Sequence, residues 1–102
     1  MKLVEHAFSD LFPEKYLENY ELKIKYTDKF KPYNANVKRY GDNLMFHLSR
    51  DWKKISKEIQ IGLVQELLTK ILHDKKKTMN MELYTMFLKN VHIAIPKTKT
   101  DD

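Results

Sequence analysis

The residue types that hold metals or carry out acid–base chemistry are sparse in this sequence. The four histidines are His6, His47, His73 and His92, and no two are four residues apart, the spacing that places two zinc ligands on one helical face. His73 and His92 would approach Glu82 only if two helices packed antiparallel. The sequence therefore predicts no metal site and no cofactor.

Residues 65–69 lie in a helical segment where a zincin would carry His-Glu-x-x-His. Glu66 occupies the glutamate position, but Gln65 and Thr69 stand where the two histidines would be. An amide and a hydroxyl are poor substitutes for imidazole at zinc. Glu66 is therefore interpreted as a solvated residue on the polar side of the helix.

Nucleophiles and phosphate-binding loops are also missing from the sequence. Ser9, Ser49 and Ser56 lie outside any G-x-S-x-G context, and there is no cysteine for a thiolate or a disulfide. Gly41 and Gly62 are the two glycines, too few for a glycine-rich phosphate loop. We expect no catalytic residue and no enzymatic activity in this chain alone.

Lysine sets the charge of the protein, with a net charge of +5 and a pI near 9.3. All but two of the 19 basic residues are lysine, the exceptions being Arg39 and Arg50. Because base reading depends on the bidentate guanidinium, any nucleic-acid binding is expected to use the phosphate backbone. The lysine bias is equally explained by codon usage or by a heat-adapted source, in which lysine is enriched on protein surfaces.

Three segments have the two-residue period of strands. Residues 20–26 alternate apolar and polar side chains, as do residues 35–38 and 44–48. Gly41 suits the first position of a two-residue type II′ turn, which needs a positive φ. Residues 35–49 are therefore predicted to form a hairpin that joins the first strand.

Three segments have helical spacing. The first lies before Pro13, the second begins near Ser56, and the third begins near Asn80 and Glu82. Ser49 is suited to cap a short turn before the second helix. The expected buried stripes are Leu3, Val4, Ala7, Phe8 and Leu11; Ile59, Leu63, Leu67 and Ile71 with Val64, Leu68 and Leu72; and Leu83, Phe87 and Val91. Gly62 is expected to permit close approach of the sheet.

These elements predict an α+β fold with an N-terminal helix, a three-stranded antiparallel sheet and two C-terminal helices packed on one face. Residues 1–97 are expected to form one domain and residues 98–102 a polar tail. No apolar run approaches the ~20 residues that span a bilayer, and no signal peptide is recognised. A cytoplasmic protein with no membrane contact is expected.

The outward side of the predicted sheet is the candidate site. If the apolar residues of the strands point inward, cations, a tyrosine and a histidine share the other face and could hold a polyanion together with a basic loop. The candidate residues are Lys23, Lys25, Lys38, Tyr40, His47, Lys75, Lys76 and Lys77. Two other interpretations stay open, a solvated face and a face that docks on another domain.

Two stretches of running sequence, residues 33–68 and 83–97, resemble a known family. They include Phe46-His47-Leu48-Ser49 with Trp52, and His92-Ile93-Ala94-Ile95-Pro96-Lys97. Together they are similar to the N-terminal part of archaeal SprT-like, zincin-type metallopeptidases over roughly residues 30 to 100. In that family the zinc-binding His-Glu-x-x-His belongs to a segment downstream of the matched region. The resemblance therefore implies no catalytic residue here.

Three functions follow as hypotheses. The first is a non-catalytic binding or positioning module, related to the N-terminal region of zincin-type peptidases, with a protein partner or adjoining domain. The second is part of a zinc metallopeptidase whose His-Glu-x-x-His lies outside this chain. The third is a domain that binds nucleic acid without sequence specificity through the basic sheet face.

Overall fold

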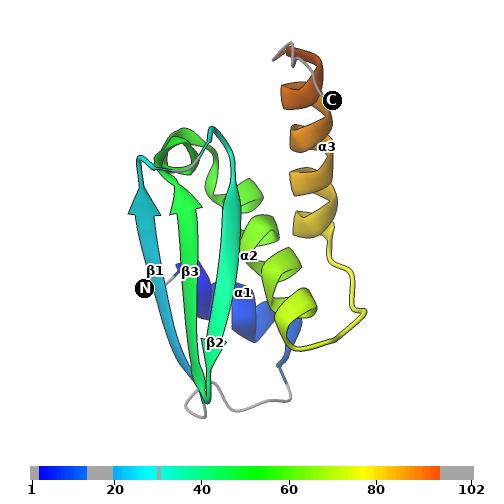
Figure 1. Ribbon diagram of the computed structural model, residues 1–102. Coiled ribbons are helices and arrows are strands. Elements are labelled where there is room, and N and C mark those ends of the chain that lie inside the picture. The colour runs from blue at the N-terminus through cyan, green and yellow to red at the C-terminus, as the bar shows by residue number, and fades with distance from the viewer. Residues whose placement is uncertain (1–2, 14–19, 30, 95–102) are drawn as a thin grey trace.

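The computed structural model describes residues 3–13, 20–29 and 31–94, with only the backbone of 92–94 (Figure 1). Its elements are α1 (Leu3–Leu11), β1 (Glu21–Thr27), β2 (Ala35–Tyr40), β3 (Asn43–Ser49), the 3₁₀ turn η2 (Arg50–Lys54), α2 (Lys57–Ile71) and α3 (Met79–Ala94). The α+β class and the order of elements are confirmed. The expected polar tail lies outside the described residues.

The sheet is mixed and not antiparallel throughout, which corrects one part of the expected fold. Its strand order is β1-β3-β2, with β3 antiparallel to β2 and parallel to β1. The last strand of the sequence therefore lies in the middle, as Figure 1 shows. A physical reason is that β3 is the most apolar strand, and the central position removes its backbone and its side chains from water most completely.

The loop between β1 and β2 makes this order possible by crossing the end of β3. Tyr33 takes a positive φ of 61° within it. The carbonyl of Asn34 then accepts two hydrogen bonds, one from the amide of Ser49 at 2.9 Å and one from Trp52 Nε1 at 3.2 Å. The crossing loop is thus tied to the end of the strand that it passes.

The hairpin between β2 and β3 matches the sequence prediction. Gly41 has a φ of +61°, and Asp42 is not among the described residues with positive φ. This pattern is that of a type II′ turn, whose twist suits the flanking strands. The turn fixes which residues of β2 and β3 share a face.

One hydrophobic core lies between the sheet and the helices α1 and α2. It contains the inward residues of β3 and the buried sides of both helices. The largest fully buried hydrophobic side chains are Trp52, Phe8, Phe12, Phe46, Leu11, Leu44, Leu48, Leu63, Leu68 and Val64. The stripes predicted for the first helix and for the middle of α2 are confirmed.

The helix α2 is buried on more sides than its predicted stripe, because α3 covers the side turned away from the sheet. A Cβ added at Gly62 would overlap the carbonyl oxygen of Asn80. The glycine therefore permits close approach of α3, whereas the sequence analysis assigned that role to the sheet.

The helix α3 begins one residue earlier than expected, and its predicted stripe is only partly buried. Thr78 caps it, because its Oγ1 accepts a hydrogen bond from the amide of Met81 at 3.1 Å. Met81 is buried, whereas Leu83, expected in the core stripe, is 37% exposed. Phe87 of the predicted stripe packs against the core, where it joins an aromatic cluster with Tyr33, Trp52 and Tyr84, with ring centroids 5.3 to 5.8 Å apart. Within the described residues, no helix is long and apolar enough to cross a membrane.

Candidate anion-binding face

The outer face of the sheet carries the predicted basic residues in two rows. Strand pairing aligns Lys25, His47 and Asn36 across the three strands, and it aligns Lys23, Met45 and Lys38 in the next row on the same face. The rows are two residues apart along the strands, or about 6.6 Å. In the described part of the chain α1 and α2 both lie on the other face, so the lysines of this face remain exposed.

A hollow of about 400 Å³ lies on this face toward the ends of β1 and β3. All of its lining residues are basic or neutral polar: Lys25, Thr27, Lys29, Asn36, Lys38 and His47. The lysine ammonium groups and the asparagine amide are hydrogen-bond donors, and the threonine hydroxyl can be one. With no acidic residue in the lining, the hollow suits an oxyanion such as a phosphate group.

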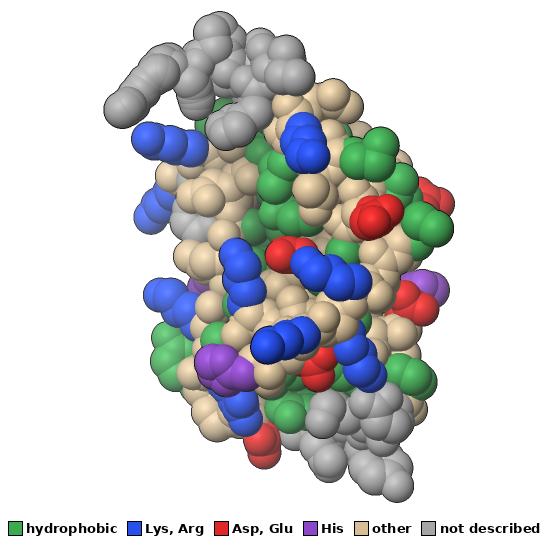
Figure 2. Space-filling model, turned by 90° about the vertical axis from the view of Figure 1, so that its right-hand side faces the viewer, with side chains coloured by type: hydrophobic (Ala, Val, Ile, Leu, Met, Phe, Trp, Pro, Cys, Tyr) green, Lys and Arg blue, Asp and Glu red, His purple; other side chains and the backbone are tan. Residues whose placement is uncertain are grey.

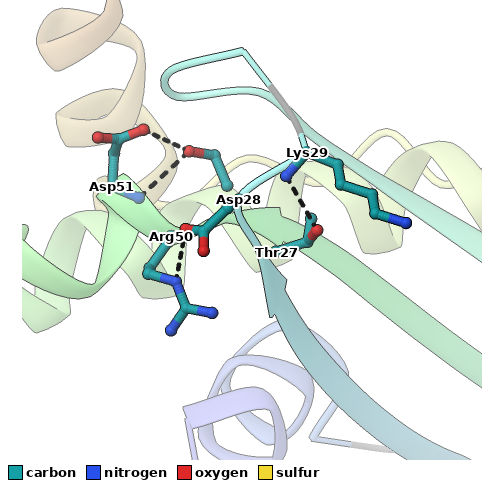
Figure 3. Close-up of polar contacts among 6 residues, drawn as sticks. Thr27, Asp28, Lys29, Arg50 and Asp51 are labelled. Carbon is teal, nitrogen blue, oxygen red and sulfur yellow. Dashed lines mark hydrogen bonds and ion pairs between the residues drawn. The ribbon is translucent and has the colours of Figure 1, made fainter.

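Near the ends of β1 and β3, two carboxylates and the Thr27 hydroxyl have hydrogen-bond partners of their own (Figure 3). Arg50 Nε donates to Asp28 Oδ1 at 2.7 Å, and the hydroxyl of Ser49 donates to Asp51 Oδ2 at 2.6 Å. The amide of Lys29 donates to Thr27 Oγ1 at 3.1 Å. The Arg50–Asp28 pair is solvent-exposed, so we assign it a positional role and little stabilisation.

At the other end of the same face lies Tyr40, which is 64% exposed. It pairs with Asn43 and follows Lys38 by two residues, so its ring is on the lysine side of the sheet. Lys23 lies 3.9 Å from the Glu21 carboxylate, the one ion pair described on this face. The positive charge is therefore least compensated around the hollow.

The three consecutive lysines of the α2–α3 loop are not part of this face. Lys76 Nζ donates to the carbonyl of Leu11 at 3.1 Å and lies 5.2 Å from the ring centroid of Phe12, both on the helical side. Lys77 lines a groove beside α3. The structure therefore separates Lys75, Lys76 and Lys77 from the five predicted residues on the strands.

Of the histidines considered for metal chemistry, the structure places His73 at the end of α2. Among the described residues, no three histidine, aspartate or glutamate side chains lie together as a metal site would need. His73 has a φ of 57° and ends α2 in a Schellman-type turn, with the amide of Asp74 donating to the Thr69 carbonyl at 2.8 Å. The side chain of His92 lies outside the described residues.

The two residues that occupy the histidine positions of the zincin pattern make different contacts: Gln65 links α2 to α1, whereas Thr69 bonds within α2. Gln65 is fully buried, and its Nε2 donates to the carbonyl of Ala7 and to Asp10 Oδ2. Thr69 Oγ1 donates to the carbonyl of Glu66 at 2.8 Å. Burial raises the pKa of Tyr84, and the neighbouring Glu66 carboxylate adds to the rise.

Three lining residues of the hollow, Asn36, Thr27 and Lys29, are not among the predicted site residues, and the last two are not predicted on the sheet at all. The predicted alternation covers residues 20–26, which leaves Thr27 off the strand and places Lys29 in a lysine-rich loop. Continuing the two-residue period from Lys23 and Lys25 would have found both. The register adds Thr27 to the strand, opposite Ser49.

Comparisons with family models, curated proteins and solved structures found no match to this chain.

Proposed function

We propose that this chain is a non-catalytic binding module that holds the phosphate backbone of a nucleic acid on the outer face of its sheet. The observation that carries the proposal is the hollow lined by Lys25, Lys29 and Lys38 without an acidic side chain. Such a lining concentrates positive charge where phosphate oxygens can accept hydrogen bonds.

The spacing of the lysines suits an extended chain of phosphates. Lys23 and Lys25 follow one another on β1, and Lys38 faces them from β2 across β3. The two outer strands are about 9.6 Å apart, two strand spacings, so lysines from both edges can reach one backbone that runs along β3. Such contacts position a nucleic acid and read no sequence.

Tyr40 favours single-stranded over duplex nucleic acid. An exposed ring at one end of the basic face offers a stacking surface to an unpaired base, and a duplex has no such base to offer. Lysine contributes point charges without the fixed fork of arginine. We therefore expect weak, salt-dependent and sequence-tolerant binding.

The test is fluorescence anisotropy with labelled single-stranded and duplex oligonucleotides, titrated at low and near-physiological salt. We expect the Lys23/Lys25/Lys38→Glu variant to lose binding. A matched Lys54/Lys57/Lys70→Glu variant makes the same change in net charge at exposed sites of η2 and α2, and it should bind nearly as well as the parent. A Lys75/Lys77→Glu variant examines the loop lysines in the same assay and should also retain binding.

Two results would contradict the proposal. One is no binding at low salt, and the other is equal loss of affinity in the sheet-face and control variants, which would indicate net charge alone. Tyr40→Leu tests the stacking separately, since it should weaken single-strand binding and leave duplex binding unchanged.

The relation to zincin-type peptidases stays a prediction supported by the resemblance of running sequence. The reading frame of the gene around codon 102 tests it. A His-Glu-x-x-His encoded shortly downstream would favour the peptidase alternative and would make this chain its positioning module.

A further inference from the structure

The helix α3 has an apolar stripe on the side turned away from α2. Met79 is 74% exposed, Leu83 37% and Met86 59%. These positions are i, i+4 and i+7, so the three side chains line up along one side of the helix. Figure 2, which looks onto the α3 side of the molecule, shows hydrophobic side chains among lysines and acidic residues.

A groove runs beside this stripe. Its volume is about 710 Å³, and its walls are the outer side of α3, Glu66 of α2 and the end of the connecting loop. Three of the lining residues are methionines: Met79, Met81 and Met86. Unbranched methionine side chains adapt to irregular apolar partners, which makes such a groove suited to receive another helix.

Two charges flank the stripe without a partner in the described part of the chain. Glu82 and Lys89 are both exposed, line the groove, and form none of the ion pairs described. They are seven residues apart, two turns of helix, so they lie on the same side at about 10 Å separation.

We propose that α3 pairs antiparallel with α3 of a second copy of this chain. A two-fold axis beside Met86 places Glu82 of one copy opposite the partner's Lys89, and by symmetry Lys89 opposite the partner's Glu82. The same axis falls between positions 85 and 86, so the two Met86 side chains lie next to each other at the centre of the interface. A parallel pairing would instead set like charges against each other.

A second copy suits this surface because a two-fold interface must complement itself. The two charges have opposite sign, and Met86 lies between them along the helix. The dimer would leave the outer face of both sheets free, since that face lies across the core from α3. This inference therefore stands independently of the proposed nucleic-acid binding.

Sedimentation equilibrium with charge-reversal variants tests the proposal. The parent should form a reversible dimer, whereas Glu82→Lys and Lys89→Glu should each be monomeric because every charge then meets its own sign. An equimolar mixture of these two variants should associate again as a heterodimer. The double variant Glu82→Lys/Lys89→Glu should dimerise like the parent.

A disulfide trap gives an independent readout, because the chain has no native cysteine. Met86→Cys should oxidise to a covalent dimer at least tenfold faster than Glu5→Cys, an exposed control on α1. Circular dichroism checks that each variant is folded. A monomeric parent, single reversals that remain dimeric, a mixture that stays monomeric, or equal oxidation rates would each overturn the proposal.

Discussion

The two faces of the sheet are built from alternate residues of the same strands, and they have opposite properties. On β3, Leu44, Phe46 and Leu48 are at most 1% exposed, while Met45 and His47 lie half-buried among the lysines of the neighbouring strands. The inner face contributes the apolar burial that stabilises the fold. The outer face contributes exposed charge, which we expect folding not to require. The contrast implies that stability and the proposed anion binding can be altered separately, one residue apart.

The largest effect is expected from the inner face. Phe46→Ala should lower the free energy of unfolding by about 3–5 kcal/mol, and Leu67→Ala on the facing helix by about 2–5 kcal/mol, because each leaves a cavity in the core. Urea denaturation followed by circular dichroism measures both. Midpoints equal to that of the parent would mean that the core does not lie between these elements.

The next effect is expected where α2 meets α3. In an exposed helix, alanine in place of glycine stabilises by roughly 1 kcal/mol. At Gly62 the new Cβ would meet the Asn80 carbonyl, so Gly62→Ala should instead destabilise by about 1–3 kcal/mol. Thermal melts show whether the substitution raises or lowers the stability. A raised melting temperature would show that α3 is free to move away from α2.

The elements of the fold were predictable from the sequence, but the arrangement of the strands was not. Alternation identified β1, β2 and β3 because it depends only on local geometry. It carries no information on which strands pair, so it does not predict that the β1–β2 connection crosses the end of β3. That crossing depends on the backbone of Asn34 and the positive φ of Tyr33, which the sequence pattern does not predict.

The candidate site was predictable to the extent that it follows strand periodicity. Lys23, Lys25 and Lys38 share a face, as expected, because the two-residue period and the hairpin register fix it. The grouping of the strand lysines with Lys76 was an assumption about tertiary distance. The structure places that residue against Leu11, on the helical side of the sheet.

A smaller effect of opposite sign is expected at the end of α2. His73 holds a left-handed conformation that costs a non-glycine residue about 1–2 kcal/mol. Glycine adopts it freely but loses more entropy on folding, so His73→Gly should stabilise by about 0.5–1 kcal/mol. His73→Ala is the control, and its free energy of unfolding should stay close to that of the parent. Chemical denaturation measures the free energy of unfolding of both variants. A destabilised glycine variant would show that the imidazole makes a contact of its own.

The smallest effect is expected from the outer face, and it completes the comparison with the inner one. Lys25→Gln/Lys38→Gln should change the free energy of unfolding by no more than about 0.5 kcal/mol, because both side chains are exposed. The two lysines lie on the outer strands in neighbouring rows, about 12 Å apart at the backbone, which is well within the ~30 Å Debye length at 0.01 M salt and beyond the ~3 Å one at 1 M. Their repulsion should therefore make the parent slightly more stable as sodium chloride is added.

The gain in stability on adding sodium chloride should be smaller in the double glutamine variant, since fewer like charges remain to be screened. The measurement is the urea midpoint of both proteins between 10 mM and 500 mM salt, with Lys54→Gln/Lys70→Gln as a control of equal charge change. A loss of several kcal/mol in the sheet variant would mean that the lysines contribute to the fold. The presence of the lysines on this face would then be explained by stability, without a bound anion.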